Sequence, residues 1–387
     1  MDKRREKLAT TAMVNWVAVL GLSLLSIQAP AQSTDQLEKP ALITGQLEKG
    51  TPQDAARELV EKLGYAQSAP CKLVFLRDEN PDLAFGEFFR AECGEKELFL
   101  KFSDKPIAQS FLPTMAFLES EPELSASILQ PLAEFSFKRK GGKQDAEEYC
   151  SAYPWVAGDT LEALLDKVDD PEQEAEYLTG VYRQLGKLLA EMHGAGLVNA
   201  DKPLAEWKSH LVQRDLHSRN LKITPDKRIV ILDIDSFASQ REPAPVQKTF
   251  VLDVVRLVFA GGKKEEPIFE DLPSAQPWMA VLPGVAEAMV TSYCQTLVGE
   301  DKAVACVSQV ANLVHDLLWK LHKREYVDFE EGEEGEEGEE GEEDEEDEED
   351  EEDEEDTMSS GDEEGTGSSV SDEEMTRRLG VVLGPLR

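Results

Sequence analysis

The chain has 387 residues, a formal net charge of −39 and 41% hydrophobic residues. This length and apolar content are sufficient for two lobes or domains with a sizeable core. Much of the negative charge lies in residues 330–356, which are only Glu, Asp and Gly, but the rest of the chain is acidic as well. The charge therefore excludes the basic surface expected of a nucleic-acid-binding protein.

Residues 1–31 have the pattern of a signal peptide. Their start is basic, residues 12–27 are mostly apolar, and Ala29-Pro30-Ala31 forms a small-x-small cleavage site before Gln32. The apolar run is short compared with the about 20 residues of a membrane-spanning helix. We therefore predict an exported protein with no stable membrane span after cleavage. The alternative is a protein that an uncleaved N-terminus anchors in the membrane.

Residues 32–69 are predicted to be a linker followed by an amphipathic helix at 54–63. Apolar runs that are rich in aromatic residues then predict five strands. These are expected at 71–76, 83–89, 97–102, 135–138 and 149–155. Short turns separate the first three strands, which should therefore pair in an antiparallel sheet.

Helices dominate the following part. Apolar residues recur every three or four positions from Tyr177 to Leu197 and again between Val285 and Lys323. Between them, 222–224 and 228–233 predict a hairpin. Residues 328–387 are acidic and of low complexity, so we expect a disordered tail. Its charge could contact basic proteins.

The five cysteines lack the spacing of a metal site. In an exported protein, Cys71 would pair with Cys93 across the predicted hairpin, and Cys294 could pair with Cys306. The sequence does not distinguish these disulfides from five buried thiols. An odd count leaves at least one thiol free in a monomer.

Three oxygen-bearing side chains are grouped near the predicted hairpin of the helical part. Asp215 is followed by Asn220 five positions later, and Asp233 ends the apolar run 229–232. Transfer of a phosphoryl group from ATP needs a carboxylate near the attacking hydroxyl and oxygen ligands for Mg²⁺. Asp215 suits the first role, and Asn220 and Asp233 suit the second.

The segments 213–220 and 229–235 resemble the catalytic and metal-binding loops of the protein-kinase-like superfamily. The form Asp-Leu-His-x-x-Asn is more similar to aminoglycoside and other small-molecule phosphotransferases. The resemblance implies an α+β fold of two lobes. A small antiparallel-sheet lobe would occupy 70–155 and a mainly helical large lobe 156–327, followed by the disordered acidic tail.

The resemblance also implies residues that bind ATP. Lys101, on the third predicted strand, would contact the phosphates, with Glu119 as its ion-pair partner and Glu121 as the competing candidate. The Gly-rich phosphate loop of protein kinases is missing, because the matching loop holds Gly86 and three carboxylates. Its absence is more typical of small-molecule kinases.

Two further roles follow from the same resemblance. The strand end at 151–154, including Ser151 and Tyr153, would contact the adenine where the lobes connect. In the large lobe, Asp253 would brace the backbone of the catalytic loop.

Two departures from the superfamily pattern leave alternatives open. Asp201 lies where phosphotransferases have their catalytic carboxylate, but position 206 is Glu instead of Asn. We favour Asp215, which makes 202–213 part of an insertion that could shape the acceptor site; Asp201 is the alternative. Asp235 stands where protein kinases have the Gly of Asp-Phe-Gly, and it would either bind a second Mg²⁺ or cap a turn.

The sequence thus predicts an ATP- and Mg²⁺-dependent phosphotransferase. It would move the γ-phosphoryl group to a hydroxyl of a small molecule or of a protein. The missing Gly-rich loop keeps a second class open, an exported pseudokinase or binding module with an acidic tail for protein interaction.

Overall fold

The computed structural model describes residues 42–48, 50–65, 70–76, 87–140, 147–237, 243–259, 276–322 and 372–386. The predicted signal peptide, the acidic turn at 78–82 and the acidic run 330–356 lie outside the described residues. Among the helices that are described, none has both the length and the apolar character needed to cross a bilayer.

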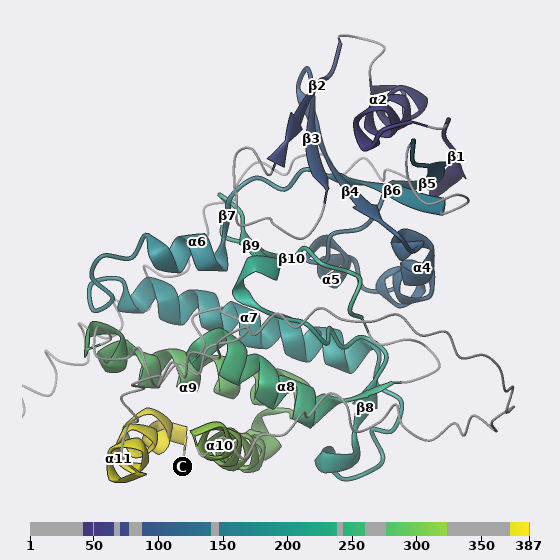
Figure 1. Cartoon of the computed structure of the whole chain (residues 1–387). Coiled ribbons are helices and arrows are strands. Elements are labelled where there is room, and N and C mark those ends of the chain that lie inside the picture. The colour runs from purple at the N-terminus through teal and green to yellow at the C-terminus, as the bar shows by residue number, and fades with distance from the viewer. Residues whose placement is uncertain are drawn as a thin grey trace, which may run out of the picture. The chain divides into compact units, whose positions relative to one another are not determined.

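A six-stranded sheet with the order β1-β5-β6-β4-β3-β2 forms the small lobe (Figure 1). Its strands are β1 (Ile43–Gln46), β2 (Lys72–Phe75), β3 (Phe88–Cys93), β4 (Lys96–Ser103), β5 (Ala133–Lys138) and β6 (Glu147–Pro154). All neighbours pair antiparallel except β1 and β5, which are parallel. The five predicted strands are confirmed; residues 83–86 of the second lie outside the described residues, and β3 begins at Phe88. The sixth, β1, lies in the predicted linker and corrects that assignment.

The two faces of the sheet pack against different partners. Leu98, Leu100 and Phe102 of β4 are buried in a cluster with helix α2 (Pro52–Lys62). Alternate residues of a strand point to opposite faces, and Phe99 accordingly packs against the core of the helical lobe. Lys101, two residues later, faces the same way. The sheet therefore presents Lys101 to the helical lobe.

Two helices separate β4 from β5. They are α4 (Ile107–Leu118) and α5 (Pro122–Ala126). Immediately after α5, Leu129 N–H donates to the Ile231 carbonyl at 2.8 Å, and Ile231 N–H donates to the Ser127 carbonyl at 2.9 Å. These bonds connect the small lobe to β10 (Ile229–Ile231) of the helical lobe.

The helical lobe is built around α7 (Ala175–Ala195), which packs along α9 (Gln276–Val298) (Figure 1). Gly186 permits this close approach, because a Cβ there would lie 2.1 Å from the Met289 carbonyl oxygen. The other long helices are α8 (Val246–Val254), continued by the π-helical turn η4 (Val255–Phe259), and α10 (Glu300–His322). The short elements are β7 (Asp159–Thr160), α6 (Leu161–Asp166), η2 (Leu204–Glu206), β8 (Lys208–Ser209), η3 (Ser218–Asn220), β9 (Leu221–Ile223), β10 (Ile229–Ile231) and β11 (Ala244–Pro245).

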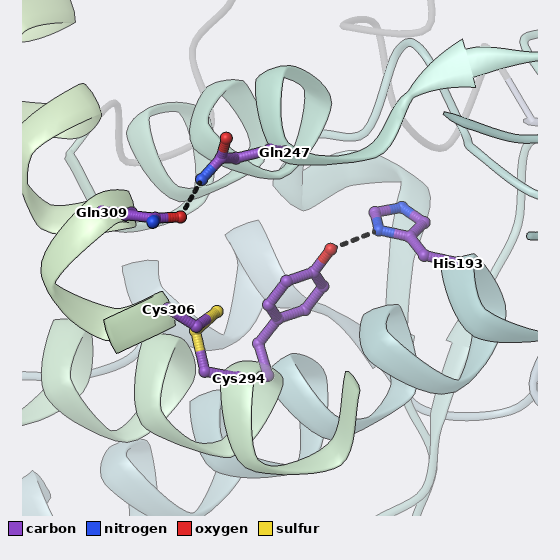
Figure 2. The surroundings of a disulfide bond; sticks show 6 residues. His193, Gln247, Cys294, Cys306 and Gln309 are labelled. Atoms are coloured by element: carbon purple, nitrogen blue, oxygen red, sulfur yellow. Dashed lines mark hydrogen bonds between the residues drawn. A yellow bond between two sulfur atoms is a disulfide. The ribbon is translucent and has the colours of Figure 1, made fainter. Parts of the chain in front are cut away.

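Each lobe contains one disulfide bond. Cys71–Cys93 links β3 to the residue before β2, and Cys294–Cys306 links α9 to α10 (Figure 2). Beside the second bond, His193 Nδ1 lies 2.9 Å from the hydroxyl of Tyr293, and burial lowers the pKa of His193 to about 3. Cys150 is a buried free thiol. Both pairings considered from the sequence are therefore present.

The last described residues correct the prediction of a tail that is disordered to its end. Residues 372–383 form α11 (Asp372–Leu383), followed by a 3-10 turn, η7 (Gly384–Leu386). The buried residues of these elements are Met375, Leu379, Val382, Leu383 and Leu386. They recur at helical spacing and join the core of the large lobe, where α11 contacts α9 and α10. The amphipathic pattern of 375–386 was masked by the acidic composition around it.

Candidate active site

The segment 214–220 and the end of the β9–β10 hairpin lie side by side. Leu232 N–H donates to the Asn220 carbonyl at 2.8 Å, and Arg214 N–H donates to the Ser236 carbonyl at 2.7 Å. Two backbone links therefore hold 214–220 against 232–236. The hairpin predicted from the sequence brings the two motifs together as expected.

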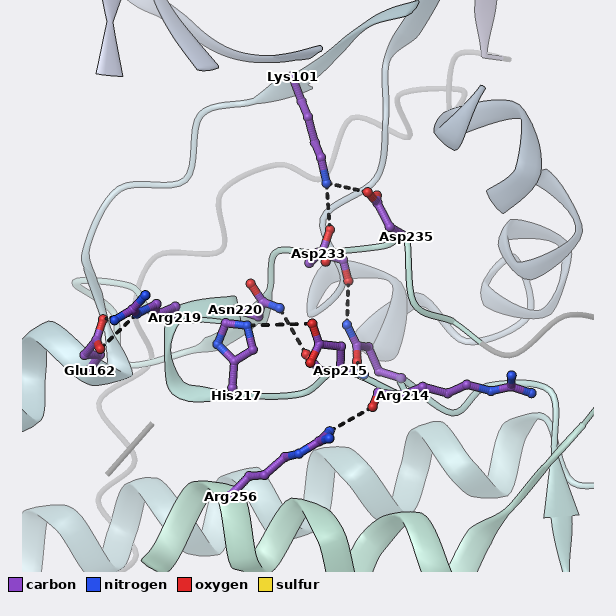
Figure 3. Close-up of polar contacts among 11 residues, drawn as sticks. Lys101, Glu162, Arg214, Asp215, His217, Arg219, Asn220, Asp233, Asp235 and Arg256 are labelled. Atoms are coloured by element: carbon purple, nitrogen blue, oxygen red, sulfur yellow. Dashed lines mark hydrogen bonds and ion pairs between the residues drawn. The ribbon is translucent and has the colours of Figure 1, made fainter. Parts of the chain in front are cut away.

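Asn220 is oriented by the backbone of Asp215, whose carboxylate Oδ2 lies 4.0 Å from His217 Nε2 (Figure 3). Asn220 Nδ2 donates to the main-chain carbonyl of Asp215 at 3.1 Å. The Asp215 N–H donates to Gln213 Oε1 at 2.5 Å, and Gln213 Nε2 donates to the Asp233 carbonyl at 3.1 Å. Because Asn220 uses its amide nitrogen on the loop, its amide oxygen is left for a ligand. The side chain of Asp215 is 27% exposed, so an acceptor hydroxyl can approach it.

Lys101 reaches from β4 to two carboxylates of the helical lobe (Figure 3). Its Nζ lies 2.9 Å from Asp233 Oδ1 and 2.6 Å from Asp235 Oδ2. The three side chains are 19%, 22% and 30% exposed, respectively. The structure thus joins Lys101 of β4, the third predicted strand, to Asp233 at the end of the hairpin. The two residues are 132 positions apart in the sequence.

The charges of this cluster do not balance. Burial acts to lower the pKa of Lys101, but attraction to Asp233 and Asp235 outweighs it and the pKa is raised. Burial, and then the charge of Asp233, raise the pKa of Asp235 to about 6, although Lys101 opposes them. Two carboxylates share a single ammonium, which favours the approach of a further cation.

The donor set fits Mg²⁺. Asp233, Asp235 and Asn220 supply the hard oxygens that this ion prefers, and the Lys101 ammonium stands in for a cation between the two carboxylates. In the described part of the chain, no group of three or more His, Cys, Asp or Glu forms a metal site by itself. Phosphate and water oxygens would therefore have to complete the coordination, as is usual for nucleotide-bound Mg²⁺.

Arg256, and not Asp253, braces the catalytic loop. Arg256 Nη1, from η4, donates to the Arg214 carbonyl at 2.9 Å. Asp253 is 1% exposed, and neither of its carboxyl oxygens has a hydrogen-bond partner among the described residues. Burial raises its pKa, against the charge of Arg256. The role expected of Asp253 is therefore corrected.

The structure does not bring Glu119 to Lys101. Glu119 follows the last residue of α4 and is exposed, at the end of the helix that follows the lysine strand. Within the described residues, the ion-pair partners of Lys101 are Asp233 and Asp235. The expected pairing is corrected. Glu119 does adjoin α4, the helix that follows the lysine strand, but it lies at the C-terminal end of that helix.

Ser151 and Tyr153 are buried on β6, on the face of the sheet that also carries Lys101 and Phe99. Ser151 is fully buried on β6, between β4 and β5, and Tyr153 is 2% exposed with its ring 6.0 Å from that of Phe99. The sheet therefore occupies the backbone of Ser151 on both sides, and after β6 the Trp155 N–H still donates to the Glu97 carbonyl at 3.1 Å. The adenine contact predicted for these two residues stays a prediction.

Gly158 allows the connection between the lobes to pass close to β9. Its φ is +116°, and a Cβ there would meet the Ile223 carbonyl oxygen at 2.1 Å. Just before it, the Trp155 ring lies between two cations, with Arg90 Cζ at 4.8 Å and Lys222 Nζ at 4.7 Å from its centroid. These contacts fix the path of the chain between the sheet and α6.

The alternative base, Asp201, lies away from this cluster. It is exposed in a turn, and no contact joins it to Lys101, Asn220 or Asp233 within the described ranges. The insertion folds on itself, since Trp207 Nε1 donates to the Lys202 carbonyl at 2.7 Å. The geometry therefore favours Asp215 as the base.

No family model matches the chain, and no curated protein matches its sequence. Among solved structures, WaaP in complex with acyl carrier protein is 11% identical, with a TM-score of 0.41 over 70% of this chain and 98% of that one. The BubR1 kinase domain is 11% identical, with a TM-score of 0.32 over 46% and 57%. Scores this low carry no weight of their own.

The arrangement within the chain decides the fold. Three antiparallel strands end in one that carries a lysine, and two helices, two more strands and a helical lobe follow. That lobe presents an Asp/Asn loop and a hairpin whose end supplies the carboxylate partner of the lysine. The fold is protein-kinase-like. It is α+β, with a small, almost wholly antiparallel sheet lobe and a mainly helical lobe, as the sequence predicted.

Proposed function

We propose that the protein is an ATP- and Mg²⁺-dependent phosphotransferase acting on a hydroxyl acceptor. The observation that carries the proposal is the Lys101 ammonium held between Asp233 and Asp235, beside the loop of Asp215 and Asn220. Phosphoryl transfer depends on positioning and on neutralising charge. A lysine, an amide and three carboxyl groups in one cluster offer both.

Each side chain then has one task. Asn220 and Asp233 hold Mg²⁺, with Asp235 as the further carboxylate near it; when bound, the ion neutralises charge on the phosphate oxygens. Lys101 moves from the two carboxylates to the phosphates. Asp215 orients the acceptor hydroxyl and accepts its proton. The hydroxyl oxygen bonds to the γ-phosphorus as the bond to the β–γ bridging oxygen breaks, and ADP leaves.

Three substitutions test these roles with [γ-³²P]ATP and Mg²⁺. Asp233→Asn should remove turnover and weaken Mg²⁺-dependent ATP binding, because it removes a metal-binding carboxylate. Asp215→Asn should keep that binding and lower kcat by about 10²- to 10⁴-fold, the usual contribution of a general base. Asp201→Asn, at the alternative position, should behave as the wild type. Normal turnover in Asp233→Asn, or its loss in Asp201→Asn alone, contradicts the proposal.

The same labelled ATP can identify the class of acceptor. Incubation with a metabolite extract and with a protein extract separates a small-molecule kinase from a protein kinase. The acidic run 330–356 makes basic proteins the first protein acceptors or partners to test.

We also propose that the protein works in an oxidising compartment. The signal-peptide pattern and the two disulfides support this, because disulfides are rare in reducing cytosol. In protein isolated from its natural source, alkylation should find only the Cys150 thiol after unfolding without reductant, and all five thiols after reduction. Five alkylated thiols without reductant would argue against export.

A binding module without catalysis is the second candidate. Phe99 lies two positions before Lys101 and faces the helical lobe, where protein kinases have the small Ala of Val-Ala-Ile-Lys. Its ring is 5.7 Å from the Phe88 ring and 6.0 Å from the Tyr153 ring. If these rings exclude a nucleotide, ATP with Mg²⁺ will not raise the Tm of the wild type but will raise that of Phe99→Ala.

A further inference from the structure

We propose that Glu134 is a positioning residue, which fixes α4 next to Lys101 in place of an ion pair between Lys101 and a glutamate of the helix. This inference rests on the proposed function. Glu134 lies on the core strand β5, and its acidic side chain is fully buried.

The carboxyl group of Glu134 ties α4 to the sheet. Its Oε1 accepts from the Ala108 N–H at 2.7 Å, and its Oε2 accepts from the Gln109 N–H at 3.1 Å. Oε1 also accepts from Ser151 Oγ at 2.9 Å. Pro106, the residue before the helix, provides no side-chain cap. The first turn of α4 is therefore capped by a side chain of strand β5. The helix dipole favours an acidic group at this N-terminal end.

This cap lies in the same row of the sheet as Lys101. Lys101 pairs with Ser151, and Ser151 pairs with Glu134. Directly opposite residues of antiparallel strands place their side chains on one face. Glu134 and Lys101 are two strands apart, or about 10 Å. A displacement of the first turn of α4 would therefore change the packing close to Lys101.

Further along, α4 contacts the segments that flank the catalytic residues. The ring of Phe111 is 5.4 Å from that of Phe237, two residues after Asp235. The ring of Phe117 is 5.6 Å from that of His210, in the insertion before Asp215. Glu134 thus anchors one end of a helix whose other contacts support both halves of the site.

Glu134→Gln tests the inference. The amide keeps the size of the side chain, but its NH₂ group cannot accept a backbone N–H. Thr51→Ala is the matched control, since it removes the N-cap of α2 on the opposite face of the sheet and should lower the Tm without changing the first turn of α4. Tm, kcat, KM for ATP, and hydrogen exchange of residues 107–118 and 233–237 are measured for both.

We expect kcat of Glu134→Gln to fall at least about tenfold below that of Thr51→Ala, because small misplacements of catalytic groups are costly. KM for ATP should change far less, and exchange should rise in 107–118 and in 233–237. Equal kcat values for Glu134→Gln and Thr51→Ala would overturn the inference.

If the wild type shows no turnover, the proposed function fails, and the exchange experiment still decides the inference. Faster exchange of both segments in Glu134→Gln, and not in Thr51→Ala, supports the coupling of α4 to the site. Unchanged exchange of 107–118 overturns it.

Discussion

The protonation of individual residues in the site depends on two carboxylates that share one ammonium group. Lys101 faces two carboxylates, and burial together with Asp233 raises the pKa of Asp235. The sequence could propose Asp233 as a ligand, because it ends an apolar strand. It could not decide between the two roles of Asp235, because the position of an ammonium from another lobe determines its charge. Glu134 was missed for a similar reason: its partners are backbone groups of α4, which no motif records.

The metal-free protein should lose stability as the pH rises from about 4 to about 6 through Asp235. The folded-state pKa of about 6 exceeds the ordinary value of 3.8. Between these values the folded state binds the proton more tightly than the unfolded state, so raising the pH favours unfolding. Asp235→Asn should remove this slope and raise the Tm near pH 7, as thermal unfolding with EDTA would measure.

Asp226→Asn is the control of opposite sign. Hydrogen bonds, first from Thr224 and then from Arg228, lower the pKa of Asp226. Its stabilising contribution is therefore present above about pH 4, so the substitution should lower the Tm near pH 7. If Asp235→Asn keeps the wild-type slope, the description of the charge cluster is wrong.

At the scale of elements, periodicity predicted most helices and strands, and tertiary contacts fixed their ends. The spacing of apolar residues predicted a helix at 177–197, and α7 runs from Ala175 to Ala195. The sequence did not indicate that α7 would approach α9 so closely. Gly186 makes this possible, because its missing side chain leaves room for the Met289 carbonyl.

Gly186→Ala should therefore destabilise the fold by about 1–3 kcal/mol, the usual cost of overpacking. Gly180→Ala on the same helix is the control. A Cβ there meets nothing within 4 Å, so it should stabilise by about 0.5–1 kcal/mol through helix propensity. Urea unfolding of both variants gives the comparison, and a stabilised Gly186→Ala would contradict the α7–α9 packing.

At the scale of the whole molecule, the described C-terminal residues are packed on the large lobe. Residues 372–386 return to the large lobe and bury apolar side chains beside α9 and α10. The acidic run 330–356 is therefore part of a connection between two packed helices. Composition could not reveal this, because the apolar face of α11 is short and follows a long acidic stretch.

Deleting 372–387 should lower the free energy of unfolding by more than about 3 kcal/mol, since several buried apolar side chains lose their partners. Shortening the run 330–356 by half while keeping α11 should change it by less than about 1 kcal/mol, because loop closure depends weakly on length. Chemical unfolding measures both. A deletion without effect would mean that α11 does not pack on the large lobe in solution.

The sequence by itself determined the lobe order, the main helices and strands, and the hairpin that sets Asp215 and Asn220 beside Asp233. Those features depend on local periodicity and on pairing between neighbours in the chain, which a sequence records directly. Only the tertiary structure decided that Lys101 meets Asp233 and Asp235, that Glu134 holds α4, that Arg256 braces the loop and that α11 returns to the core. Each of these depends on where side chains distant in the sequence meet, and on the burial and charge they find there.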